Sequence, residues 1–494
     1  MIYTLGLVAY MAVMLIIGYY AKGKVQNTED YLVAGRKLNK TFSSFTLLSC
    51  FIGGMVVVGV SGTTFSVGIW NEELNWGIIP ALGGGAMCLL VCGLIYMPRL
   101  WKLKMVSLGD YYYARFGRVT GLVSTLMICS GFIFWTAVHI LVFTKIVRPI
   151  LGWSPEVAVI SAVSIIVIYT IMGGLWAVAA TDIFQVSLVI IGILVLTPVA
   201  IHSAGGWEFF RSNIPPDLIH FTPQTSSPHS WLAWIAAFLM MGIGGVPSPD
   251  IMQRAFAAKS ANVARFAGCA AAVGCLFVGT LVVLLGLLGA ELVSNGTIAE
   301  EALHGDPELI IPVMLMQLLP VPLVVLFLGA SLAAVMSAAD SAMLALAGMF
   351  TKNIYKDILH PSASDKNMVL VTRICVGAVG ILAGIIAVSF PYAFNLSVFA
   401  FDLLLASLFV PLTLGLFWKK ANGYGAMAGM LMGFAVRIIG GGMQQGFTLA
   451  GILSPLDTWY LFTLFSPLAS LAAMVPISLL TQRMDEPVIL QEYA

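Results

Sequence analysis

Charged residues are scarce in this sequence. Only 10% of its 494 residues are Asp, Glu, Lys or Arg, whereas 60% are hydrophobic. A soluble globular protein carries about 25% charged residues, so the composition excludes an ordinary soluble fold. The formal net charge of +1 provides no large field for binding a polyanion, and no basic cluster is interleaved with aromatic side chains as in a nucleic-acid site. We therefore expect no nucleic-acid partner.

Signatures of disulfides, transition-metal sites and catalysis are also lacking. The seven cysteines are odd in number and fall in apolar segments, which favours small core residues over a disulfide framework. The six histidines show no metal-ligand spacing, so zinc and haem sites are not expected. We also find no nucleophile elbow, phosphate-binding glycine loop or pair of loop carboxylates. An enzyme is the least supported class, and no catalytic residue is predicted.

Long apolar segments fill most of the chain. Segments of roughly 20 apolar residues can cross about 30 Å of hydrocarbon as helices. No soluble domain is left over, so residues 1–494 are predicted to form one transmembrane domain. The first segment has neither a charged leader nor a small-residue cleavage site, and we expect it to be a retained span rather than a signal peptide. The thirteen expected spans lie at 3–21, 42–65, 76–97, 120–149, 157–176, 182–203, 230–254, 263–290, 321–350, 368–390, 394–418, 422–440 and 459–481.

The distribution of lysine and arginine predicts the orientation. Loops after odd-numbered spans are rich in these residues, whereas loops after even-numbered spans hold only Arg211. Short cytoplasmic loops collect basic residues. The amino terminus is therefore expected outside and the carboxyl terminus in the cytoplasm of a plasma membrane, the inner membrane in a bacterium.

Two of the spans contain helix-breaking sequences. The second span includes "SCFIGGMVVVG" and the seventh includes "MGIGGVPSPD". Broken helices inside a bilayer persist where they line a cavity or bind something, and a pair at matching positions indicates a secondary transporter built from inverted repeats. The breaks lie five spans apart, which predicts repeats at 42–203 and 230–418, with 3–21 and 422–481 as additional helices. Ordinary glycine packing between helices is the alternative.

Polar residues in the ninth span form a candidate ion site. In "MSAADSAM", Ser337, Asp340 and Ser341 are spaced i, i+3 and i+4 and share one helix face. A charged residue in mid-span costs about 2.5 to 3.5 kcal/mol on insertion scales, which favours a functional reason for Asp340. Hard cations take oxygen ligands, which serine hydroxyls, a carboxylate and the carbonyls of a broken helix can supply. The alternative for Asp340 is a structural hydrogen bond to a neighbouring helix.

Three motifs carry a resemblance to a known family. They are "GGLWAVAATDIFQ", "AAVMSAADSAMLALAGMFTKNIY" and "GYGAMAGMLMGFAVRIIGG". With them the sequence resembles the sodium:solute symporter family, most of all its high-affinity choline transporter branch. The resemblance implies an all-α polytopic membrane protein with 13 transmembrane helices and a five-plus-five inverted-repeat (LeuT-like) core.

The resemblance also implies a sodium site between the second and ninth spans. The family's common site takes backbone carbonyls and hydroxyls at positions that match Ser49, Ile52, Ala334, Ser337 and Ala338. Ser49 replaces a frequent alanine, which leaves a carbonyl ligand unaffected. Ala338 replaces a frequent hydroxyl residue, so one expected ligand is missing.

A second sodium position exists in some members of the family. Its matches here are Asp182, Ser337, Asp340 and Ser341. Two nearby carboxylates repel each other unless a cation or a proton lies between them. Asp340 could thus bind sodium, carry a proton or brace the site. For Asp182 the alternative is a helix cap, because aspartate is favoured where helices begin.

The solute is expected beside the two breaks, where Phe51, Trp76, Trp135, Ser248 and Asp250 are the candidates. Trp135 matches one position of the aromatic cage that holds quaternary ammonium in the choline branch, by cation-π attraction. Phe51 and Ser248 stand where that branch has tryptophans, which weakens choline as the solute. Asp250 could pair with an amine. An interfacial belt residue is the alternative for Trp135.

These features together predict a sodium-coupled symporter that works by alternating access. It would import a small cationic or zwitterionic solute, such as a quaternary amine or an amino acid, with sodium as the only metal and no other cofactor. A monomer in the lipid bilayer is expected to suffice. A transporter-like sensor is the alternative, although only 14 residues follow Leu480, and a channel would need a filter sequence that we do not find.

Overall fold

The computed structural model describes residue 16, residues 33–439 and residues 459–490, and nearly all of them are helical. The first expected span, 3–21, lies outside the described residues apart from residue 16. Short 3-10 or π-helical turns join several of the helices. The helices and strands are α3 (Lys40–Ile52), α4 (Ser61–Val67), β1 (Trp70–Asn71), β2 (Trp76–Gly77), α5 (Gly85–Val91), α6 (Met97–Lys102), α7 (Leu108–Leu151), α8 (Pro155–Ser203), α9 (Trp207–Asn213), α10 (Pro228–Gly242), α11 (Pro249–Ala257), α12 (Ala261–Ser294), α13 (Ile310–Leu318), α14 (Val321–Met349), α15 (Asp365–Ser389), α16 (Ala393–Leu404), α17 (Val410–Phe417), α18 (Gly423–Ile439) and α19 (Trp459–Leu480).

Both predicted helix breaks are present. In the second expected span, α3 ends at Ile52, Gly53 leaves the helical conformation with ψ −178°, and the chain continues through a π-helical turn at Met55–Val60 into α4. In the seventh, α10 ends at Gly242 and α11 begins at Pro249. The proline fits the first turn of α11 because that position needs no backbone donor.

Other boundaries differ from the expectation. A single helix, α8, runs through the junction expected between the fifth and sixth spans, and its apolar parts are Pro155–Ile171 and Thr181–Ser203. Within α7, Gly117 has φ +82° and separates a short first segment from the long apolar one. Nine helical segments in the described ranges are long and apolar enough to cross a membrane. The count of thirteen and the repeat relation stay predictions.

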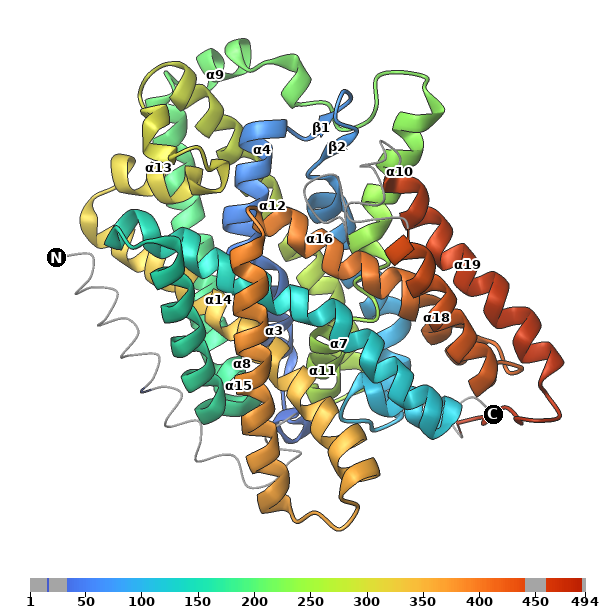
Figure 1. Cartoon of the computed structure of the whole chain (residues 1–494). Coiled ribbons are helices and arrows are strands. Elements are labelled where there is room, and N and C mark those ends of the chain that lie inside the picture. The colour runs from blue at the N-terminus through green and yellow to red at the C-terminus, as the bar shows by residue number, and fades with distance from the viewer. Residues whose placement is uncertain (1–15, 17–32, 440–458, 491–494) are drawn as a thin grey trace.

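Helices α3 and α14 lie at the centre of the bundle. The apolar window of the segment Lys40–Val67 is 94% buried by protein, against 22% for Asp365–Ser389 and 28% for Trp459–Leu480. In Figure 1, α14 lies beside α8 while α18 and α19 run together along one side, in agreement with the contacts between these helices. The segment that contains the first helix break is thus the most enclosed of the membrane-length helices in the described ranges.

The basic loops meet at one end of the molecule, which we call the basic end. Arg36 donates to the carbonyl of Lys104 at 2.8 Å, Arg118 donates to the carbonyl of Asp357 at 2.6 Å, and Lys352 pairs with Asp110. These contacts join the loops after the first, third and ninth expected spans. The β1–β2 hairpin, with Trp70 paired to Gly77, lies at the opposite end, the hairpin end (Figure 1).

Candidate functional site

The first break faces α14 across a space with carbonyl oxygens around it. A methyl group added at Gly53 would lie 3.4 Å from the carbonyl oxygen of Ser49, 3.8 Å from that of Ala334 and 3.8 Å from the Cβ of Ala338. Because α3 ends at Ile52, the carbonyls of its last turn lack helical partners. Oxygens from two helices therefore converge beside Gly53, and this donor chemistry fits a sodium ion.

The Ser337 hydroxyl is held by a buried carboxylate. Ser337 Oγ donates to Asp182 Oδ1 at 2.5 Å, and the other carboxylate oxygen accepts from the Thr46 hydroxyl. Since the hydroxyl proton of Ser337 points at Asp182, the lone pairs of Ser337 Oγ point elsewhere and can face a cation. Ser49 uses its own hydroxyl on the carbonyl of Thr46, at 2.8 Å. Sequence reasoning missed Thr46, a threonine one turn before Ser49.

An arginine completes this cluster, and sequence reasoning missed it as well. Arg254 of α11 is fully buried. Its Nε donates to Thr46 Oγ1 at 3.1 Å, its Nη2 donates to Ser341 Oγ at 3.0 Å, and Nη2 lies 3.9 Å from Asp182 Oδ2. The available signal was weak: a cation only four residues after Asp250, at the last residue of an expected span.

Asp340 points to a different partner from its neighbours. It is buried, and its Oδ1 accepts a hydrogen bond from the Thr170 hydroxyl of α8. In the part of the chain that the structure describes, its Oδ2 has no hydrogen-bond partner. Ser341 instead accepts from Arg254 and donates to the carbonyl of Ser337 at 3.0 Å. The four residues predicted for a second sodium thus divide into Asp182 with the two serines, and Asp340 with Thr170.

Three aromatic rings lie together beside the ion site. The ring of Trp135 in α7 is 4.8 Å from that of Phe401 in α16, and Phe401 stacks on Phe51 at 6.4 Å. We call Phe51, Trp135 and Phe401 the aromatic trio. Sequence reasoning missed Phe401, since nothing in an apolar segment tells a phenylalanine that packs beside Trp135 from any other core phenylalanine. His139 contacts Trp135 edge-on at 4.7 Å and bonds the Trp135 carbonyl through Nδ1 at 2.8 Å.

The Trp135 indole has an unused donor. Trp135 is 1% exposed, and its Nε1 has no hydrogen-bond partner among the residues that the structure describes. A buried tryptophan N–H usually finds a partner. The indole could therefore donate to a solute that enters between the rings.

Trp76, another predicted solute residue, lies in a separate aromatic group. Its ring is 6.0 Å from that of Phe394 and 5.2 Å from that of Trp459. Trp76 belongs to β2 at the hairpin end, so the structure does not place it with Phe51 and Trp135.

Ser248 and Asp250 form the start of α11. The Ser248 hydroxyl donates to Asp250 Oδ1 at 2.5 Å, and the backbone N–H of Ile251 donates to the same oxygen at 2.7 Å. Both side chains are buried. The carboxylate therefore stabilises the first turn of the helix after the break, where negative charge is favourable.

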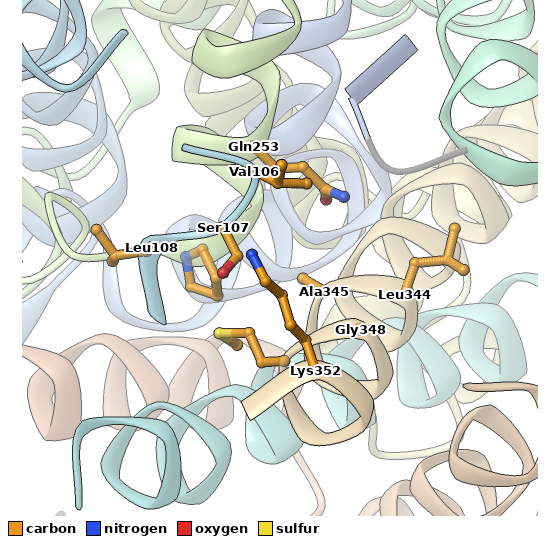
Figure 2. A pocket seen from close by; sticks show the side chains of 10 residues that line it. Val106, Ser107, Leu108, Gln253, Leu344, Ala345, Gly348 and Lys352 are labelled. Atoms are coloured by element: carbon orange, nitrogen blue, oxygen red, sulfur yellow. The ribbon is translucent and has the colours of Figure 1, made fainter. Parts of the chain in front are cut away.

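A narrow pocket lies between the start of α11 and the last turns of α14, on the side of the basic end. Its lining includes Leu344 and Ala345, one turn beyond Ser341, together with Pro249 at the start of α11. About 20 Å³ of space is open in it, room for roughly one water molecule. Figure 2 shows the Lys352 side chain reaching toward Ser107 across this pocket, and its Nζ binds Asp110 Oδ2 at 2.7 Å.

The hairpin end is held by a second charged cluster. Lys145 of α7 pairs with Asp306, lies 3.4 Å from Glu308 Oε2 and donates to the carbonyl of Pro391 at 2.8 Å. Glu308 also accepts the backbone N–H groups of the first two residues of α16, at 3.0 Å each. These contacts fasten the turn before α13 to α7 and α16.

Comparison with known proteins identifies the family of the chain. The sequence model of the sodium:solute symporter family matches residues 31–433, well over half of the chain. The chain belongs to the sodium:solute symporter family. It is accordingly a symporter and a multi-pass membrane protein, and sodium is its coupling ion.

The similar members of this family include transporters of two solutes. The High-affinity choline transporter 1 of Caenorhabditis elegans is 28% identical over 88% of this chain and 78% of its own length. The High affinity choline transporter 1 of Homo sapiens is 29% identical over 88% of this chain and 76% of its own. The High-affinity proline transporter PutP of Bacillus subtilis (strain 168) is 28% identical over 86% of this chain and 89% of its own.

Solved structures share the fold. A Na+-coupled sialic acid symporter in a substrate-bound outward-open state superposes with a TM-score of 0.81 at 19% identity, over 99% of both chains. Mhp1, a nucleobase-cation-symport-1 family transporter in a closed conformation, gives 0.59 at 13% identity over 95% of this chain and 98% of its own. These likenesses support a LeuT-like transporter fold for this symporter.

Proposed function

We propose that this symporter imports a small cationic or zwitterionic organic solute together with sodium, by alternating access between the hairpin end and the basic end. The observation that carries the proposal is the meeting of the first helix break with α14, beside the aromatic trio. A choline-like ammonium and a proline-like zwitterion both present a positive group that aromatic faces attract. Similarity to both choline and proline transporters supports this range of solutes.

The proposed sodium ligands are the residues around the first break. One ion is held by carbonyls of Ser49, Ile52 and Ala334 with the Ser337 hydroxyl, while Ala338 adds a carbonyl but no hydroxyl. Whether a second ion joins at Asp182, Asp340 and the two serines of α14 depends on where the Arg254 guanidinium lies. Phe51, Trp135 and Phe401 face the solute, with Ser248, Asp250 and Trp76 as further candidates.

The proposed orientation places the basic end in the cytoplasm of a plasma membrane, the inner membrane if the host is a bacterium, with the amino terminus outside. The clustering of the basic loops supports it, since the positive-inside rule concerns such short loops. Residues 42–203 and 230–418 would then be the two inverted repeats, with 422–481 outside them.

Uptake by purified protein in liposomes tests the function. Labelled choline, glycine betaine and proline are offered with an inward sodium gradient or with potassium in its place. At least one solute should accumulate above its outside concentration with sodium alone. Binding of a solute without accumulation would favour a sensor instead, and flux at channel rates without accumulation would favour a pore.

A further inference from the structure

The Arg254 guanidinium is a positive charge built into the ion site. It contacts α3 through Thr46, α14 through Ser341 and α8 through the charge of Asp182. Arg254 is fully buried, and Asp182 is buried with it. In the described part of the chain, Arg254 is the only cationic side chain within 4 Å of the Asp182 carboxylate.

The same atoms are the ones that a second sodium ion would need. Ser341 Oγ already accepts a hydrogen bond from Arg254 Nη2, and Asp182 Oδ2 lies 3.9 Å from that nitrogen. Both oxygens of Asp182 also accept hydroxyl protons, from Thr46 and Ser337. A sodium ion bound between Asp182 and Ser341 would contact the guanidinium directly, and two cations in a buried site repel each other.

We infer that Arg254 is a tethered cation that competes with sodium for the position between Asp182 and Ser341. With α11 packed as observed, the symporter binds one sodium ion, beside Gly53, and the second position is filled by the guanidinium. This inference rests on the proposed function, because it assumes that the residues around Gly53 bind the first ion.

The placement of Arg254 on α11 links that second position to helix movement. Residues 243–248 separate α11 from α10, so this helix of nine residues can move apart from the rest of the seventh span. Moving α11 withdraws the guanidinium and exposes the Asp182 carboxylate to sodium. By linkage, sodium at that position favours the displaced helix and the guanidinium favours the packed one.

Counting bound sodium on the purified full chain tests the inference without a solute. Equilibrium dialysis against ²²Na+, at the concentration where binding to Arg254→Gln has just reached its plateau, should give one ion per wild-type chain. Arg254→Gln should bind two ions, because it removes the competitor and leaves the carboxylate. If Arg254 only supports the structure or positions other residues, Arg254→Gln should not gain an ion. It should bind one ion with weaker affinity, or none. Arg254→Lys keeps the charge and should bind one ion.

Arg437 provides a matched control. It is also a buried arginine paired with a buried aspartate, Asp402, but between α16 and α18. Arg437→Gln should leave the count at one ion. A second ion in that variant would mean that any unpaired buried carboxylate recruits sodium, and would overturn the inference.

The remaining outcomes separate this inference from the proposed function. Two ions on the wild type, or one ion on a monodisperse Arg254→Gln variant, overturn the inference and leave sodium coupling intact. No ion on the wild type overturns the proposed sodium site. If Arg254→Gln does not fold, Arg254→Ala also removes the competing charge, leaves the carboxylate of Asp182 and should bind two ions. A count of one or none on a monodisperse Arg254→Ala variant would overturn the inference.

Discussion

At the residue scale, the Ser337 hydroxyl connects the Asp182 carboxylate to the proposed sodium site. Ser337 donates to Asp182 and has lone pairs left for sodium. Ser337→Ala removes a proposed sodium ligand and leaves one Asp182 oxygen without that donor. A hydrogen bond to a charged group is worth about 1.5 to 3 kcal/mol, so the sodium concentration for half-maximal uptake should rise about tenfold or more. Sodium titration of uptake measures it.

Ser331 offers a matched control on the same helix. It is a buried serine of α14, and its hydroxyl has no partner within the described residues. Ser331→Ala should leave the half-maximal sodium concentration within about twofold of wild type. An equal rise in both serine variants would indicate a general weakening of α14 and would refute the specific role of Ser337.

The unpartnered indole of Trp135 leads to a prediction about the solute. If a carboxylate of the solute accepts the Nε1–H, Trp135→Phe removes that donor while keeping an aromatic face. The apparent affinity for proline or glycine betaine should fall about tenfold, and that for choline, which has no carboxylate, should fall less. Competition uptake with the three unlabelled solutes measures the difference.

Trp70 is the control for this substitution. Its Nε1 is also buried without a partner in the described ranges, but it lies in β1 at the hairpin end. Trp70→Phe should change the affinity for the three solutes equally or not at all. If Trp135→Phe weakened all three to the same degree, the indole would act through packing rather than as a donor.

The sequence alone pointed to the polar residues Ser337 and Asp182 of this site, but it did not point to Arg254 or Phe401. Ser337 was recognisable because polar groups are expensive in an apolar segment, and Asp182 was recognisable through the resemblance to the family. Arg254 stands at the last residue of an expected span, where a cation is ordinary, and only the packing of α11 against α3 reveals that it is buried. Phe401 is one of many phenylalanines in apolar segments, and only the packing of α16 against α3 and α7 places its ring beside Phe51 and Trp135.

At the scale of the helix, the breaks were the most predictable feature, because glycine and proline disfavour helix whatever surrounds them. The boundaries were less predictable. The periodicity of apolar residues reveals neither the continuity of α8 across the expected junction nor the change of backbone conformation at Gly117, where φ is +82°. Hydropathy also treats α3 and α15 alike, although one is buried at the centre and the other faces outward.

The fit between α3 and α14 can be tested at Gly54. A methyl group there would lie 2.2 Å from Val335 Cγ2 and 2.4 Å from Val142 Cγ1, both closer than carbon atoms tolerate. Gly54→Ala should therefore push α14 away from the break, lower thermal stability by about 1 to 3 kcal/mol and raise the half-maximal sodium concentration. A thermal melt and a sodium titration measure these two effects.

Removing the two opposing methyl groups should restore the fit. In Gly54→Ala/Val142→Ala/Val335→Ala both close contacts are relieved, so sodium affinity should recover toward wild type even though small cavities remain elsewhere. If the single variant kept full sodium affinity despite lower stability, the distance between α3 and α14 would not determine ion binding.

At the scale of the whole molecule, charged contacts close both ends around the site. Lys145 fastens the hairpin end, whereas Lys352 with Asp110 lies beside the narrow pocket toward the basic end. The proposed alternating access requires that these two clusters open in turn. The proposed solute and sodium sites lie between the clusters, so the joint presence of solute and ion can favour a closed form that neither favours alone.

The number of coupling ions sets how far this molecule can concentrate its solute. One inward sodium releases about 2.3 kcal/mol at 100 mV, inside negative, and about 1.4 kcal/mol for a tenfold gradient. That sum supports roughly several-hundred-fold accumulation of a neutral zwitterion, and a second ion would roughly square it.

Wild type should therefore plateau at several-hundred-fold accumulation in liposomes under these conditions. The measurement is the inside-to-outside ratio of labelled proline or glycine betaine, whichever the protein carries. Halving the membrane potential should lower that plateau about sevenfold for one ion but about fiftyfold for two. A fiftyfold fall would contradict the tethered cation at Arg254, whereas a plateau insensitive to sodium would contradict symport itself.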